Sequence, residues 1–148
     1  MRLWHQLLIP YLDRQHLLGQ HRECCALRGN GWRKKHATVD YVFKYSKIPL
    51  ICYHRLVIEE MENRGYHVNE DWKSPAYNGK IAGWDYREFI KNQDIIRRFL
   101  YDHIPHHMAF REHNHDYLIQ CITLLKERNA PMDFDSIEKN LLKGDNHV

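Results

Sequence analysis

The sequence predicts a mostly α-helical protein: a small single-domain bundle of about four to five helices, joined by long irregular loops. Apolar residues recur at helical spacing in several separate segments, and glycine or proline interrupts the chain between them. The length of 148 residues suits one hydrophobic core, and the 43% hydrophobic content is close to the globular norm. With no internal repeat or low-complexity segment visible, we expect one domain over residues 1–148.

The first helix is predicted from about Asp13 to Leu27, after a loop over residues 3–10. Aspartate is a favoured N-cap because its carboxylate accepts hydrogen bonds from the free N–H groups of the first turn. The glycines of Gly29-Asn30-Gly31 favour a stop directly after the last apolar residue. Residues 32–48 are expected to be irregular.

A second helix is predicted to begin at Pro49 and to end at Gly65, since proline suits a first turn and glycine suits a C-terminal cap. Before it, the β-branched and aromatic residues over 38–43 favour either a short extended piece or a packed loop. The remaining elements are predicted from apolar spacing and from glycine and proline content: a long loop over 66–84 and helices over about 85–101, 114–128 and 135–143.

One face of the first predicted helix gathers polar side chains. His16 and Glu23 are seven residues, or two turns, apart and share this face with Gly19 and Gln20, while Arg22 lies beside them. The apolar residues fall toward the other side and can be buried: Leu17, Leu18, Cys24 and Cys25. An imidazole and a carboxylate therefore line a polar surface close to the N-terminus, which suggests chemistry involving the terminal amine.

The positive charge of the chain is concentrated in its first part. Residues 1–55 contain ten Lys and Arg against three acids, whereas the remaining 93 residues contain twelve against sixteen. A basic half that carries a candidate site suits a polyanionic partner, although a solvated basic surface without a partner gives the same pattern. The candidate site beside this half favours a nucleic acid, and the residues expected to contact it are Arg2, His16, Arg22, Arg28, Arg33, Lys34 and Lys35.

Composition argues against several other classes of protein. The mean hydropathy of −0.69 and the short apolar runs predict no membrane span, and Arg2 and His5 do not suit a signal peptide. The cysteines at 24, 25, 52 and 121 form neither a CxxC pair nor a dense disulfide framework, so reduced thiols in a cytoplasmic protein are expected. A nucleic-acid partner would place such a protein at the nucleoid.

Several short motifs occur in a recognisable order: Arg2 next to the start, Gln15-His16-Leu17, Arg22-Glu23, the basic run 33–36 and the helix end 62–66. In this ordered set the chain resembles the pyrimidine-dimer DNA glycosylase/AP lyase family. The resemblance is best over residues 1–66 and patchy over 102–128. Residues 67–101 look like a variable insert, and 144–148 form a polar tail in place of the aromatic, basic end of the family's phage member.

The resemblance implies a catalytic mechanism for this chain. In the family a free N-terminal α-amine attacks the sugar and a glutamate on the first long helix handles protons, which assigns these roles to Met1 and Glu23. The bulky second residue Arg2 is expected to keep Met1 in place. The reaction would remove a damaged pyrimidine, with a UV dimer as the expected lesion, through a Schiff base, and would nick the strand by β-elimination. No cofactor, metal, membrane or obligate protein partner is expected; the partner is damaged double-stranded DNA.

Two alternatives remain open from the residues themselves. A non-catalytic nucleic-acid-binding module would use the basic half without needing Glu23 or a free terminus. A metal-dependent nuclease would use the histidines at 103, 106, 107, 113 and 115. Pro105 makes a regular ligand-bearing helix through this second cluster unfavourable, because proline disrupts helical hydrogen bonding.

Overall fold

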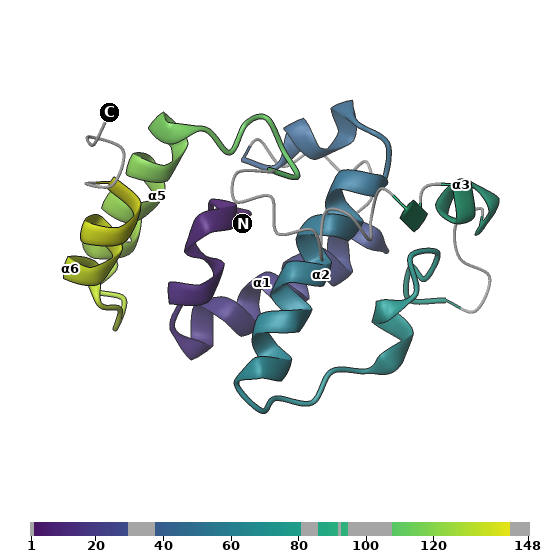
Figure 1. Cartoon of the computed structure of the whole chain (residues 1–148), viewed down its shortest axis with the longest axis horizontal. Coiled ribbons are helices and arrows are strands. Elements are labelled where there is room, and N and C mark those ends of the chain that lie inside the picture. Colours follow the sequence, from purple (N-terminus) through teal and green to yellow (C-terminus); the bar gives the residue numbers. More distant parts are fainter. Residues whose placement is uncertain (1, 30–37, 81–85, 92, 95–107, 143–148) are drawn as a thin grey trace.

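The computed structural model describes residues 2–29, 38–80, 86–91, 93–94 and 108–142, and the regular structure within these residues is helical (Figure 1). The predicted mostly α-helical class is therefore confirmed. Four helices carry most of the described fold: α1 (Arg14–Arg28), α2 (Ile48–Asn63), α3 (Tyr86–Lys91) and α5 (His115–Glu127). Shorter turns are η1 (Gln6–Tyr11), η2 (Asp40–Lys44), η3 (Glu70–Lys73), α6 (Phe134–Ile137) and the π-helical η4 (Glu138–Leu142).

Helix α1 begins where the sequence predicts. The Asp13 side chain accepts a hydrogen bond from the backbone N–H of His16 at 3.3 Å, which satisfies one of the free donors of the first turn. The helix ends at Arg28, and the N–H of Gly29 bonds back to the carbonyls of Cys25 and Ala26. The predicted first helix and its N-cap are confirmed within one residue.

Helix α2 has proline in its first turn and a glycine after its last, again as predicted. Gly65 adopts a φ of +86°, and its N–H bonds to the Glu62 carbonyl while the Tyr66 N–H bonds to that of Met61. This pair of bonds is the Schellman arrangement, which needs a left-handed residue and so favours glycine. Helix α5 ends in the same way, with Asn129 at a φ of 54° in the place of glycine.

One prediction about local structure was wrong. The segment 3–10 is not a loop, because residues from Gln6 onward form η1, which the buried side chains of Leu8 and Ile9 anchor in the core. Of the two possibilities for 38–43, the extended one is ruled out, since its second half winds into the 3₁₀ turn η2 around the buried Val42. The described part of the predicted loop 66–84 is irregular apart from the short turn η3.

The C-terminal helices agree with the predictions where they are described. Helix α5 lies within the predicted 114–128, with Asn114 as its N-cap. The last predicted helix, 135–143, is observed as α6 followed by η4. Helix α3 occupies the first part of the predicted 85–101, and most of the remainder lies outside the described residues.

One hydrophobic cluster joins the N-terminal segment to the helices. Helices α1 and α2 pack against each other, and α2 also packs against η1. In Figure 1 the N-terminal segment runs between α5 and the α1–α2 pair. This cluster takes buried apolar side chains from all of these parts: Leu3, Trp4, Leu8, Leu12, Leu17, Leu27, Leu50, Tyr53, Ile58, Phe110, Leu118 and Leu125. The N-terminal segment from Leu3 onward is thus part of the core.

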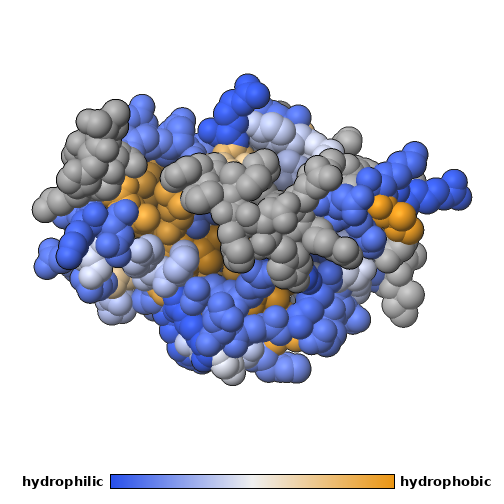
Figure 2. Space-filling view, viewed as in Figure 1, coloured by the Kyte–Doolittle hydropathy of each residue, from blue (hydrophilic) through white to orange (hydrophobic). Residues whose placement is uncertain are grey.

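The outer surface is largely polar. In Figure 2 hydrophilic residues cover most of the face shown, and hydrophobic residues, in orange, gather near α5 and in smaller patches. Among the described helices, none combines the length and apolar character needed to cross a membrane.

Candidate functional site

A pocket of about 270 Å³ opens beside the N-terminal segment, along the polar face of α1. It contains the residues that the sequence placed together on that face and adds others from the N-terminal segment and the end of α5. Its lining consists of Arg2, Trp4, Gln15, His16, Gly19, Gln20, Arg22, Glu23 and Arg128. The predicted grouping of His16, Gly19, Gln20 and Glu23 on one face therefore matches the structure.

Two groups in the pocket can handle protons. Glu23 lines the pocket although only 8% of its surface is exposed, so its carboxylate is largely shielded from water. His16 Nδ1 lies 2.7 Å from Asp13 Oδ1. Because an ionised carboxylate only accepts hydrogen bonds, this contact places a proton on Nδ1 and fixes the orientation of the ring. The His16 ring also packs edge-on against Trp4, with centroids 5.8 Å apart.

Arginines supply positive charge to the pocket. Among the described residues that line it, three are arginines: Arg2, Arg22 and Arg128. The Arg2 and Arg128 guanidinium groups lie over the Trp4 ring, at 5.8 Å and 5.2 Å from its centroid. Guanidinium groups can bind phosphate through paired hydrogen bonds. The pocket therefore combines a shielded carboxylate with a rim suited to an anionic ligand.

Gln20 ties the start of the chain to α1. Its side-chain NH₂ donates to the Arg2 carbonyl at 2.8 Å, and its oxygen accepts from the Trp4 N–H at 3.0 Å. The Tyr53 hydroxyl also contacts this oxygen and the Trp4 carbonyl, each at 2.7 Å. Gln20 is 3% exposed, so these bonds are sheltered from water. The backbone of residues 2–4 is consequently fixed along the pocket.

Buried histidines hold the segment that follows. His5 Nδ1 accepts from the Leu7 N–H, and His113 Nδ1 accepts from the Gln6 N–H, at 3.1 Å and 3.0 Å. Both rings must therefore be unprotonated at Nδ1. Burial lowers the pKa of His5 to about 4 and that of His113 to about 3, which agrees with neutral rings. His113 also contacts the Tyr41 hydroxyl through Nε2 at 2.8 Å.

Arg28 does not occupy the DNA-facing position that was predicted for it. It is fully buried, and its guanidinium donates to the carbonyls of Trp72, Ser74 and Tyr77 at 2.7–2.9 Å. Burial lowers its pKa to about 10, so it remains a cation at neutral pH. Arg28 fastens the loop around η3 to the end of α1, and it has no surface to offer a phosphate.

Several predicted site residues lie outside the described residues. These are Met1 and the basic run of Arg33, Lys34 and Lys35. The histidines at 103, 106 and 107 also lie there, while His113 belongs to the buried network described above. Sequence analysis missed Arg128, which approaches the pocket only because α5 packs near the N-terminal segment.

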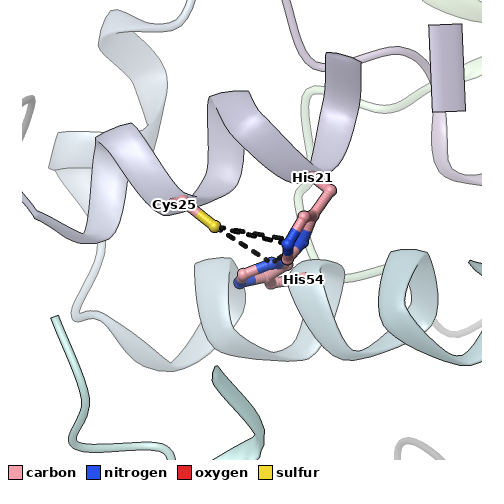
Figure 3. Close-up of side chains that lie close together, drawn as sticks. All are labelled: His21, Cys25 and His54. Carbon is pink, nitrogen blue, oxygen red and sulfur yellow. Dashed lines mark hydrogen bonds between the residues drawn. The ribbon is translucent and has the colours of Figure 1, made fainter. Parts of the chain in front are cut away.

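A second polar cluster lies between α1 and α2, where His21 and Cys25 face His54 (Figure 3). Their nitrogen and sulfur atoms lie within 4.8 Å of one another, close enough to hold a metal ion. The spacing of His21 and Cys25, one turn apart on a helix, is a signal in the sequence that the analysis did not use.

Comparison with known families identifies a family for this chain. The family model described as pyrimidine dimer DNA glycosylase matches residues 1–74, which is half of the chain and includes η1, α1 and α2. No curated protein and no solved structure matches the chain. The matched residues contribute all of the pocket lining except Arg128. This chain belongs to the pyrimidine dimer DNA glycosylase family.

Proposed function

We propose that this protein is a DNA glycosylase with AP lyase activity. It removes a damaged pyrimidine, with a UV-induced dimer as the expected lesion, and then nicks the strand by β-elimination. The observation that carries the proposal is the pocket itself, in which the shielded Glu23 and three arginines lie beside the fixed backbone of residues 2–4. Family membership supports the repair of damaged DNA.

The α-amine of residue 1 is the proposed nucleophile. Its ordinary pKa of about 7.7–8.0 leaves roughly a tenth or more of it unprotonated at neutral pH, whereas lysine titrates near 10.4. Residue 1 is bonded to Arg2, whose carbonyl Gln20 holds at 2.8 Å. Consecutive Cα atoms are about 3.8 Å apart, so this anchor limits how far the amine can lie from Arg2. Because the backbone of Arg2 is fixed beside the pocket, we place the amine of residue 1 within a short distance of a sugar bound there.

The proposed reaction has two bond-breaking stages. The amine nitrogen bonds to C1′ of the damaged nucleotide as the glycosidic bond breaks, and the departing base keeps the electron pair and takes up a proton. Opening of the sugar ring gives an iminium, which makes the C2′ proton acidic. The Glu23 carboxylate removes this proton, the electrons form a C2′–C3′ double bond, and the 3′ phosphate leaves. Water then hydrolyses the imine and frees the amine.

The remaining pocket residues bind and orient the DNA in this proposal. Arg2, Arg22 and Arg128 contact phosphates that flank the damaged nucleotide, and two of these guanidinium groups, those of Arg2 and Arg128, also lie over the Trp4 ring. Exposing C1′ in a duplex requires bending or flipping, which costs a few kcal/mol and is cheapest where the stack is already damaged. Recognition of damage thus relies partly on the easier deformation of the lesion.

Strand cleavage of a duplex with one cyclobutane dimer tests the proposal. Wild-type protein should cleave at the dimer, also when EDTA is added at the start of the reaction, and should leave undamaged duplex intact. Glu23→Gln should retain binding and lose cleavage. The matched control is Glu127→Gln, which removes a carboxylate from the exposed end of α5 and should cleave normally. Binding without cleavage by wild-type protein would favour a non-catalytic module, and cleavage lost in EDTA would favour a metal-dependent nuclease.

A further inference from the structure

Helices α1 and α2 bring together two imidazoles and a thiol away from the pocket. His21 and Cys25 are four residues apart on α1 and so lie one above the other, and His54 of α2 points toward both (Figure 3). A helix turns by about 100° per residue, which places this pair on the side of α1 opposite the pocket residues. The cluster therefore has no part in the proposed reaction at the pocket.

The distances in the cluster are close to those of a tetrahedral metal centre. Zinc lies about 2.0–2.1 Å from histidine nitrogen and 2.3 Å from thiolate sulfur, so neighbouring ligand atoms are roughly 3.3–3.6 Å apart. His21 Nδ1 lies 2.9 Å from His54 Nε2, and Cys25 Sγ lies 3.9 Å and 4.0 Å from these same atoms. Shifts of a few tenths of an ångström would bring these three distances to the required values, together with a rotation of the His21 ring, whose Nε2 lies nearer to Sγ at 3.7 Å.

The environment of the cluster also suits a metal ion. His54 is fully buried, while His21 and Cys25 are half-buried and leave one side accessible to an incoming ion and a fourth ligand. His21 Nδ1 and His54 Nε2 lie within hydrogen-bond distance of each other, so one of these two atoms accepts and carries a lone pair that can bind an ion. The Trp72 ring packs near both imidazoles, with centroids 6.5 Å and 5.8 Å away.

Arg28 restricts which ion the cluster can hold. Its Nη1 lies 2.9 Å from His54 Nδ1 and must donate to it, so the proton of neutral His54 sits on Nε2 and points toward His21. A metal must displace that proton. The buried guanidinium also repels a dication, which makes a negatively charged ligand necessary. Burial raises the pKa of Cys25 to about 11, and a metal that bonds strongly to sulfur is needed to deprotonate it.

We propose that His21, Cys25 and His54 form a binding site for a thiophilic transition-metal ion of the Zn²⁺ class. His21 Nδ1, His54 Nε2 and the Cys25 thiolate are the ligands, and a solvent molecule completes the tetrahedron. Binding releases the thiol proton and the His54 Nε2 proton, so Cys25 binds as a thiolate and His54 as an imidazolate whose negative charge Arg28 stabilises at Nδ1. Hard cations such as Mg²⁺ and Ca²⁺ are excluded, because they prefer oxygen ligands. The bound ion joins α1 to α2 on the side of α1 away from the pocket, so its removal should leave cleavage in EDTA intact.

Cobalt titration of the full-length, untagged protein tests the site. Co²⁺ should bind at one equivalent and produce the near-ultraviolet sulfur-to-cobalt band together with the visible bands of tetrahedral cobalt, and Zn²⁺ should abolish both. Cys25→Ala should remove the sulfur band and weaken Zn²⁺ binding by at least 100-fold. The matched controls are Cys52→Ala, which lies outside the cluster, and His67→Ala, which is exposed on the surface.

Loss of metal binding in Cys25→Ala can be distinguished from loss of folding. Cys25 is only half-buried, so Cys25→Ala should keep the wild-type circular dichroism spectrum and melt cooperatively. The proposal is overturned if wild-type protein shows no sulfur-to-cobalt band, or if Cys25→Ala binds Zn²⁺ as tightly as the controls do. Elemental analysis after dialysis against equimolar Zn²⁺ and Mg²⁺ should find about one zinc per chain and no magnesium; equal retention of both would also overturn it.

Discussion

Replacing Gln20 with methionine should loosen the N-terminal segment while keeping the length of the side chain. The substitution removes the bonds to the Arg2 carbonyl and the Trp4 N–H, and it removes one of the two contacts of the Tyr53 hydroxyl. Trp4 is 3% exposed, so water cannot easily replace the lost partner of its N–H. An unsatisfied buried group costs about 1–3 kcal/mol, and an ordinary lost hydrogen bond about 0.5–1.5 kcal/mol. Together these losses predict about 2–4 kcal/mol of destabilisation.

This free energy converts into a measurable change in melting temperature. For a chain of this size 1 kcal/mol lowers Tm by about 2–4 °C, so Gln20→Met should melt roughly 5–15 °C lower in differential scanning calorimetry. Gln15→Met is the matched control, because Gln15 lies on the same helix and lines the pocket but is exposed. An exposed substitution of this kind should change the free energy of unfolding by no more than about 0.5 kcal/mol.

The same substitution should slow the chemistry more than it weakens binding. A displacement of about 1 Å at a reacting group can cost 100-fold in rate. Under single-turnover conditions well below its Tm, Gln20→Met should therefore cleave an abasic-site duplex roughly 10- to 100-fold more slowly, with DNA affinity within a few-fold of wild type. Equal Tm and equal cleavage rates for Gln20→Met and Gln15→Met would refute the idea that Gln20 positions the start of the chain.

Three further predictions follow from the site. Glu23→Gln should lower the single-turnover rate of β-elimination by about two orders of magnitude, and near-normal cleavage would rule out Glu23 as the base. Arg128→Gln should reduce the log–log salt slope of DNA binding by about one, and an unchanged slope would show that Arg128 touches no phosphate. The pKa values of His5, about 4, and of His113, about 3, lie below the value near 6.5 in the unfolded chain. The unfolded chain therefore binds more protons, and the free energy of unfolding falls as the pH drops from about 6.5 to 4. Each histidine should lower the free energy of unfolding by roughly 2 kcal/mol between pH 7 and pH 5. In urea titrations His113→Gln should reduce this pH dependence of stability, whereas the control His67→Gln should not.

Local signals in the sequence were sufficient for the main helices and for one side of the pocket. The Asp13 cap and the seven-residue spacing of His16 and Glu23 depend only on neighbours within two turns, and the structure reproduces both. The same reasoning could not predict η1, because its conformation follows from the burial of Leu8 and Ile9 and not from a local helix signal. Pro10, which reads as a helix breaker, is accommodated inside this 3₁₀ turn.

Contacts between distant parts of the chain account for the features that the sequence did not reveal. Arg28 looks like a surface cation on the last turn of a helix, but its carbonyl partners are 44 to 49 residues away along the chain. Arg128 reaches the pocket from the end of α5, more than 100 residues after Trp4, which it covers. His54 completes the cluster with His21 and Cys25 only because α2 packs against α1.

Borohydride trapping tests the central claim most directly. Wild-type protein is mixed with an abasic-site duplex and reduced, which converts an imine into a stable covalent bond. The account predicts a protein–DNA adduct whose sugar remnant maps by mass spectrometry to the α-amine of residue 1, within the peptide released by cleavage after Glu23. Chemical acetylation of that amine should abolish the adduct. An adduct on a lysine side chain, or no adduct from protein that cleaves the strand, would contradict the proposed mechanism.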